Sequence, residues 1–182
     1  MRTIEWRDGV VVTIDQTRLP NEEVFLELKS VQEVASAIKE MKVRGAPLIG
    51  VTAAYGLALA AYHSKAKTRE SLLKELEASA NVIRATRPTA VNLFWAVDRV
   101  LKRAHETVGD HEAVRRAVIE EANRMADEDV EVNRRIGRNG SRLLKDGDTL
   151  QRRKPRNGRL RDSLSGDKIR LGRGQACKRN RG

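Results

Sequence analysis

The spacing of apolar residues changes near residue 30 of this 182-residue chain. Before that point, the stretch TIEWRDGVVVTIDQTRLP contains two short β-like runs on either side of Asp8-Gly9, a dipeptide that favours a type I′ hairpin turn. Pro20 interrupts the pattern, and EVFLEL is expected to form another short strand. The pattern predicts an N-terminal β-hairpin element within residues 1–29.

From Ser30 onward, apolar residues recur at the three- and four-residue intervals of amphipathic helices. Four such faces are present: Val31, Val34, Ala35, Ile38 and Met41; Leu72, Leu73, Leu76, Ala80 and Ile83; Leu93, Val97, Val100, Leu101 and Ala104; and Val114, Val118, Ala122, Met125, Val132 and Ile136. The fold class is therefore expected to be mainly α, with an antiparallel helical bundle over residues 30–145 behind the β element.

The stretch PLIGVTAAYGLALAAYH is apolar on nearly all sides and rich in small residues, which predicts a central helix buried by its neighbours. Its apolar run is expected to be too short and too rich in Gly, Ala and Thr to span a membrane. The N-terminus has no signal-peptide pattern, so we expect a cytoplasmic protein without membrane contact. Trp6, Phe94 and Trp95 are interpreted as core residues, and the three histidines, His63, His105 and His111, as surface residues.

Charge is distributed unevenly along the chain. The formal net charge is +11, but residues 151–182 hold 12 Lys and Arg against 2 Asp and Glu, which leaves 24 against 23 in residues 1–150. The segment 151–182 also has no aromatic residue and only four Leu or Ile. Such a composition cannot bury enough apolar area to offset the entropy of ordering, so residues 146–182 are expected to form a disordered basic tail. Weak non-specific nucleic-acid binding through this tail is expected from its charge.

The loop VRGAPLIG places Arg44 and Gly45 directly before Pro47, a favoured first residue of a helix. This arrangement suits phosphate, because free backbone N–H groups and the helix dipole would face the anion and Arg44 would add a forked donor. The alternative is that Arg44 caps the preceding helix and Gly45 terminates it. Spacing alone favours the alternative.

The stretch RATRPTAVNLFW has the same two interpretations. Arg87 precedes Pro88 at a helix end, and Thr89 is placed to cap the next helix. An arginine that satisfies the helix dipole is the default interpretation. The remaining body shows no nucleophile–base pair, and the single cysteine, Cys177, lies in the tail, so we expect no metal, no cofactor and no disulfide.

Four stretches occur in one order: DQTRLP, MKVRGAPLIGVTAAYG, TRPTAVNL and DGDT, over residues 3–149. In this combination the chain resembles the N-terminal half of the methylthioribose-1-phosphate isomerases. These are aldose–ketose isomerases of methionine salvage, and they are related to regulatory subunits of a translation-initiation exchange factor. The resemblance implies that Arg44, Gly45 and Ala46 contact the substrate and that Arg87 binds it, which makes a sugar phosphate the expected anion. It also implies a homodimer.

After DGDT the chain departs from the family pattern, which continues with T-H-C-N-A-G, where the cysteine is catalytic, and then with a Rossmann-like α/β domain that supplies a catalytic aspartate. This sequence has Leu150-Gln151-Arg152 instead. A reading shifted by one nucleotide from Asp148 permits T-H-C-N-A-G and a long continuation without a forbidden codon. We therefore expect residues 146–182 to be an out-of-frame tail, the second domain to be missing, and the chain to hold no catalytic residue and to be inactive as written.

Two alternatives to an isomerase half remain open. The first is a helical regulatory protein of the initiation factor 2B-related type. The second is a nucleic-acid-binding protein whose basic tail is genuine. The DQTRLP and RGAP stretches favour the isomerases.

Overall fold

The structure, a computed structural model, describes residues 2–142. Strands β1 (Ile4–Arg7), β2 (Val10–Ile14) and β3 (Phe25–Leu28) precede helices α1 (Val31–Lys39), α2 (Ala46–His63), α3 (Arg69–Arg84), α4 (Val91–Glu106) and α5 (His111–Ser141). The chain divides into two units, Met1–Glu131 and Val132–Gly182, with the boundary inside α5. The expected out-of-frame tail lies outside the described residues, and the division into residues 1–29, 30–145 and 146–182 stays a prediction.

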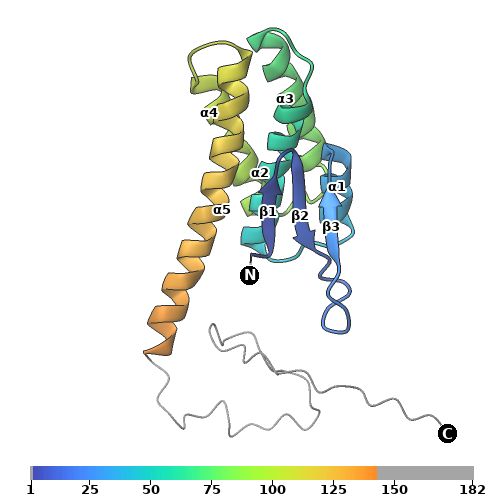
Figure 1. Ribbon diagram of the computed structural model, residues 1–182, viewed down its shortest axis with the longest axis vertical. Helices are drawn as coiled ribbons and strands as arrows, with labels where there is room; N and C mark the ends of the chain where they lie inside the picture. Colours follow the sequence, from blue (N-terminus) through green and yellow to red (C-terminus); the bar gives the residue numbers. More distant parts are fainter. Residues whose placement is uncertain (1, 143–182) are drawn as a thin grey trace, which may run out of the picture. The chain divides into compact units, whose positions relative to one another are not determined.

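The three strands form one antiparallel sheet in the order β1-β2-β3, which lies across one face of the helices (Figure 1). The hairpin prediction is confirmed. Asp8 and Gly9 both have positive φ, 42° and 84°, as a type I′ turn requires. The EVFLEL strand also forms, and it extends the hairpin to a three-stranded sheet by pairing Leu26 with Thr13 of β2.

Helix α2 is the buried centre of the bundle, as its composition predicted. Its buried residues run from Leu48 to Ala61 on all sides of the helix. Small residues allow the neighbouring helices to approach closely: a Cβ on Gly56 would lie 2.8 Å from Ile83 Cδ1 of α3 and 3.0 Å from Val34 Cγ1 of α1. At 18 residues and a mean hydropathy of 1.2, α2 is long and apolar enough to cross a membrane, contrary to the expectation from its apolar run. However, 72% of it is buried inside the protein, as in a core helix.

Most of the predicted apolar faces are buried, including the whole α4 face and Leu72, Leu76, Ala80 and Ile83 of α3. Ala35 and Leu73 are partly buried, and three predicted positions are exposed. Val132 and Ile136 are 41% and 63% exposed, because the buried residues of α5 end at Ala126. Met41 is 45% exposed because it lies beyond the end of α1.

Met41 ends helix α1 in a Schellman motif. Its φ of 59° is left-handed, its N–H donates to the carbonyl of Ile38 (3.2 Å), and the N–H of Lys42 donates to the carbonyl of Ala37 (3.0 Å). Glycine usually occupies this position, since a side chain disfavours positive φ. The motif turns the chain away from α1 toward the start of α2.

The aromatic residues divide between core and surface. Trp6 and Phe94 pack against the core as partly buried residues, and Trp6 stacks on Tyr55 with ring centroids 6.0 Å apart. The interpretation of Trp95 as a core residue is wrong, because its side chain is 55% exposed. Trp95 is two positions from both Leu93 and Val97, so it lies about 200° around the helix from Leu93 and away from the buried stripe.

Candidate anion-binding site

Helices α2 and α4 begin at the same end of the bundle. A Cβ on Gly50, one turn into α2, would lie 3.1 Å from the carbonyl oxygen of Asn92, the second residue of α4. Helix α3 runs the opposite way, since Arg69 at its start donates to the carbonyl of His105 at the end of α4 (2.7 Å). The loops that carry Arg44 and Arg87, far apart in sequence, therefore lead into two neighbouring helix N-termini.

The start of α2 is open to solvent and carries no negative side chain. The N-cap is Gly45, with φ 91° and ψ 130°, no side chain caps the helix, and the first turn contains no acidic residue. The helix begins at Ala46, so Pro47 is its second residue. The sequence had suggested that Pro47 would be the first. No atom lies within 4 Å of a Cβ placed on Gly45. The uncapped N–H groups and the positive end of the helix dipole thus face an unobstructed space.

Arg44 is exposed, and its Nε donates to the carbonyl of Met41 (3.1 Å). The Met41 carbonyl lies beyond the last residue of α1, so this bond holds the turn after the helix and does not cap one of the helix's own carbonyls. Within residues 2–142 the terminal nitrogens of Arg44 have no hydrogen-bond partner, so the forked face of the guanidinium remains available. The alternative interpretation of Gly45 is wrong, because Met41 ends α1 and Gly45 begins α2.

The start of α4 repeats this arrangement. Its N-cap is Ala90, without a side-chain cap and without an acidic residue in the first turn. The predicted cap by Thr89 is wrong, since the N–H of Ala90 donates to the carbonyl of Arg87 (3.1 Å) in a turn that places Thr89 one residue too early. The side chain of Arg87 is half-buried and has no ion-pair or hydrogen-bond partner in the described part of the chain.

The loop before α2 lies at the protein surface, since Arg44, Gly45, Ala46 and Pro47 are all exposed. One hollow of about 270 Å³ lies between β3 and α1, and another of about 300 Å³ lies on the outer side of β1 and β2. Neither is lined by Arg44, Gly45, Ala46 or Arg87.

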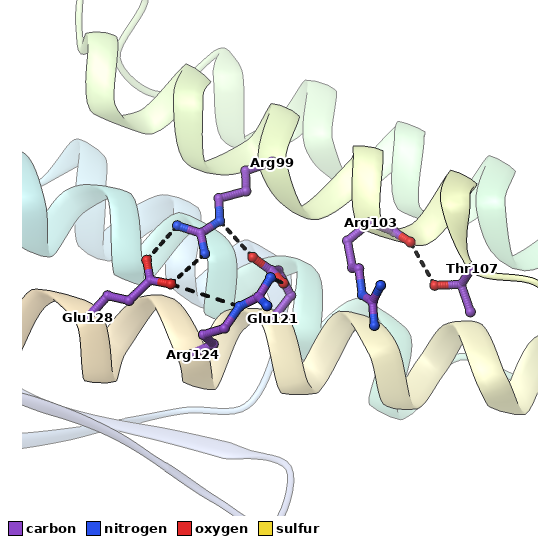
Figure 2. Close-up of polar contacts among 6 residues, drawn as sticks. All are labelled: Arg99, Arg103, Thr107, Glu121, Arg124 and Glu128. Atoms are coloured by element: carbon purple, nitrogen blue, oxygen red, sulfur yellow. Dashed lines mark hydrogen bonds and ion pairs between the residues drawn. The ribbon is translucent and has the colours of Figure 1, made fainter.

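A second group of charged side chains joins α4 to α5 (Figure 2). This α4–α5 ion-pair cluster consists of Arg99, Glu121, Arg124 and Glu128. Arg99 donates from Nε to Glu121 (2.6 Å) and from its terminal nitrogens to both oxygens of Glu128 (2.6 and 2.8 Å). Arg124 pairs with the other oxygen of Glu121, which is 3% exposed.

The electrostatics of this cluster follow from its hydrogen bonds. The bonds from Arg99 hold the pKa of Glu128 below its ordinary value, and the two carboxylates raise the pKa of Arg99 further. The Trp95 ring lies under the guanidinium, 5.3 Å from the Arg99 Cζ to the ring centroid. Arg99 thus gives three of its five N–H groups to the two carboxylates, and the cluster connects α4 to α5.

No three His, Cys, Asp or Glu side chains lie together as potential metal ligands among residues 2–142. Sequence reasoning missed one group at the anion-binding end: Asp15 and Thr17, in the loop after β2, are hydrogen-bonded to each other and lie beside the segment before Arg44. The spacing Asp-x-Thr directly after a strand is a turn signal that could have indicated this arrangement.

Residues 42–151 match the model of the Initiation factor 2 subunit family. The chain belongs to this family. The methylthioribose-1-phosphate isomerase of Geotalea uraniireducens is 52% identical over 151 residues, which are 82% of this chain and 43% of that protein. The enzyme of the same name from Acetivibrio thermocellus is 48% identical over 154 residues.

Two solved structures resemble this fold to the same degree. The 5-methylthioribose 1-phosphate isomerase from Pyrococcus horikoshii gives a TM-score of 0.76 at 46% identity, over 79% of this chain and 40% of that one. The translation initiation factor eIF-2B, subunit delta, from A. fulgidus gives a TM-score of 0.75 at 42% identity, over 81% of this chain and 43% of that one. The chain thus spans less than half the length of the relatives it matches.

Proposed function

We propose that this chain is the substrate-binding part of an enzyme that isomerises 5-methylthioribose 1-phosphate to 5-methylthioribulose 1-phosphate. The observation that carries the proposal is the meeting of two uncapped helix N-termini, each preceded by an arginine, at one end of the bundle. Relatives about half identical to the chain and named for this activity supply the choice of substrate.

The chemistry of the loops suits a phosphate ester. The N–H of Ala46 and the forked nitrogens of Arg44 are directed donors, and charge-assisted bonds from such donors to phosphate are stronger than neutral ones. Gly45, without a side chain, leaves room for the anion to approach the backbone. Arg87 adds a second positive charge from the neighbouring loop.

Binding groups of this kind do not by themselves isomerise a sugar. Ring opening and the transfer of a proton or hydride between C1 and C2 require groups placed at the reacting atoms. Among residues 2–142 no side chain at the anion-binding end is placed as a nucleophile–base pair. We therefore assign substrate binding to this chain, place the reacting groups in the portion of the relatives that it does not match, and expect the purified chain to show no turnover.

The test is calorimetric titration of the 182-residue chain with 5-methylthioribose 1-phosphate. We expect Arg44→Ala to weaken binding about tenfold or more, since a hydrogen bond to a charged group contributes roughly 1.5–3 kcal/mol. Arg103→Ala is the matched control, because Arg103 is an exposed arginine near the opposite end of α4.

Two ligand controls accompany the titration. The phosphate-free sugar 5-methylthioribose should bind much more weakly, and inorganic phosphate should compete. Equal binding of the phosphate-free sugar, or an equal effect of Arg44→Ala and Arg103→Ala, would reject the proposal. Turnover by the purified chain would refute the assignment of the reacting groups elsewhere.

The likeness to an initiation-factor subunit supports a second candidate, a regulatory protein without isomerase chemistry. The two structural relatives match equally well, so the bundle itself does not separate these functions. Absence of sugar-phosphate binding in the titration would favour the regulatory role.

A further inference from the structure

The loop between β2 and β3 contains a buried acid that the proposed phosphate contacts do not use. Asp15 is 7% exposed. Its carboxylate accepts hydrogen bonds from the hydroxyl (2.6 Å) and the backbone N–H (2.9 Å) of Thr17. The bond from the Thr17 hydroxyl, with the charges of Lys42 and Arg18, holds the pKa of Asp15 below its ordinary value. A carboxylate is therefore present here at neutral pH.

These bonds fix the direction of the chain at the base of the loop. The N–H of Asp15 donates to the carbonyl of Val24 (2.8 Å), which brings the two ends of the loop together, and the N–H of Arg18 donates to the carbonyl of Asp15 (3.2 Å). With the carboxylate also bonded to Thr17, the peptide between Asp15 and Gln16 has little freedom to rotate.

The fixed peptide is bonded to the segment that leads to Arg44. The N–H of Gln16 donates to the carbonyl of Lys42 (2.9 Å). On the other side of that segment, the N–H groups of Lys42 and Val43 donate to the carbonyl of Ala37 (3.0 and 3.3 Å), and the Val43 side chain is fully buried. The backbone just before Arg44 is thus held from both sides.

We propose that Asp15 is a positioning residue of the anion-binding site: its carboxylate holds the Gln16 N–H against the Lys42 carbonyl and so sets the backbone at Arg44 and Gly45. The inference rests on the proposed function, in which these two residues bind the sugar phosphate. Donors that are held in place before the ligand arrives lose less conformational entropy on binding, which raises affinity.

Three variants separate positioning from general stability. Asp15→Ala removes the acceptor, whereas Asp15→Asn keeps an oxygen that can accept both bonds from Thr17. Asp110→Ala is the matched control, because Asp110 accepts the N–H of Ala113 (2.9 Å) at the start of α5. The start of α5 lies near the end of α2, since Arg115 donates to the carbonyls of Ala61 and Ser64. This substitution removes a similar hydrogen bond between a side chain and the backbone, at the opposite end of the bundle.

The first measurement needs no ligand. In spectra of the ¹⁵N-labelled full chain, Asp15→Ala should shift the amide signals of residues 42–46 and speed hydrogen exchange at the Gln16 amide, while Asp15→Asn stays close to wild type. Asp110→Ala should leave those signals in place. Unchanged signals in Asp15→Ala would overturn the inference.

The second measurement is affinity for 5-methylthioribose 1-phosphate. We expect Asp15→Ala to bind about five- to tenfold more weakly, the scale of one lost hydrogen bond, with Asn restoring most of the affinity. Wild-type affinity in Asp15→Ala, or an equal loss in Asp110→Ala, would also overturn it. If the wild-type chain itself does not bind the sugar phosphate, the proposed function fails, and the ligand-free spectra still decide whether Asp15 holds this segment.

Discussion

Arginine side chains are used in two different ways in this bundle. In the α4–α5 ion-pair cluster, Arg99 gives hydrogen bonds to two carboxylates and stacks on an aromatic ring. At the anion-binding end, Arg44 gives one bond to a backbone carbonyl, and Arg87 has no side-chain partner within the described residues. Arg99 gives three of its five N–H groups to carboxylates, and the negative charges of these carboxylates disfavour a further anion beside it. An arginine that meets no carboxylate, beside an uncapped helix, is placed for an anion from outside.

The largest expected effect is the loss of the paired arginine. Arg99→Ala would leave the buried Glu121 carboxylate with Arg124 alone, and removing one partner of a buried pair costs about 3 kcal/mol. Urea unfolding at neutral pH measures this free energy. Lys102→Ala, which removes an exposed pair with Glu106, is the control and should change it by less than about 0.5 kcal/mol. Equal changes in the free energy of unfolding for Arg99→Ala and Lys102→Ala would contradict a special structural role for the α4–α5 ion-pair cluster.

A smaller effect is expected from closing the space between the two helix N-termini. In Gly50→Ala the new Cβ would meet the Asn92 carbonyl oxygen at 3.1 Å, a backbone atom held in α4. Overpacking of this kind costs roughly 1–3 kcal/mol in the free energy of unfolding, and the helix propensity gained by alanine, about 0.5–1 kcal/mol, offsets part of it. A loss of sugar-phosphate affinity should accompany it, because the spacing of the Arg44 and Arg87 loops depends on this contact. Gly137→Ala is the control, since nothing lies within 4 Å of its Cβ position.

Lowering the pH should weaken the α4–α5 ion-pair cluster, because it protonates carboxylates, whereas Arg44 and Arg87 keep their charge. The pKa of Glu128 is lowered in the folded state, so its pairing with Arg99 stabilises the protein at any pH above the ordinary glutamate pKa. This contribution is lost as the pH falls through the pKa that Glu128 has in the folded state. Because Glu128 is half exposed, Glu128→Gln should cost no more than about 1 kcal/mol near neutral pH.

The measurement is a series of thermal unfolding curves from about pH 7 to about pH 3 for both proteins, since ordinary glutamates titrate near pH 4.3. The difference between wild type and Glu128→Gln should shrink toward the acid end. A constant difference would show that the carboxylate charge is not what stabilises the contact.

The smallest effect on stability is expected at the unpaired arginines. Arg44→Ala and Arg87→Ala should each change the free energy of unfolding by less than about 0.5 kcal/mol, since neither side chain neutralises a buried charge. A loss above about 1 kcal/mol in either variant would indicate a structural role.

The sequence by itself determined the elements and much of the core. Period and turn chemistry are local properties, so Asp8-Gly9 and the α3 and α4 faces could be predicted from neighbouring residues alone. The same local reasoning placed Arg44 and Arg87 at loop ends, and only the resemblance to a family favoured a ligand role for them, which stays a prediction.

Only the tertiary structure places the Arg44 and Arg87 loops at the same end of the bundle. No local pattern shows that α2 and α4 start side by side, because that depends on the contact between Gly50 and Asn92, which are 42 positions apart in the chain. Nor does any local pattern bond Gln16 to Lys42, a contact between two segments that are separate in the chain. Each of these results from packing between distant segments, where long-range contacts outweigh the intrinsic preference of a single residue.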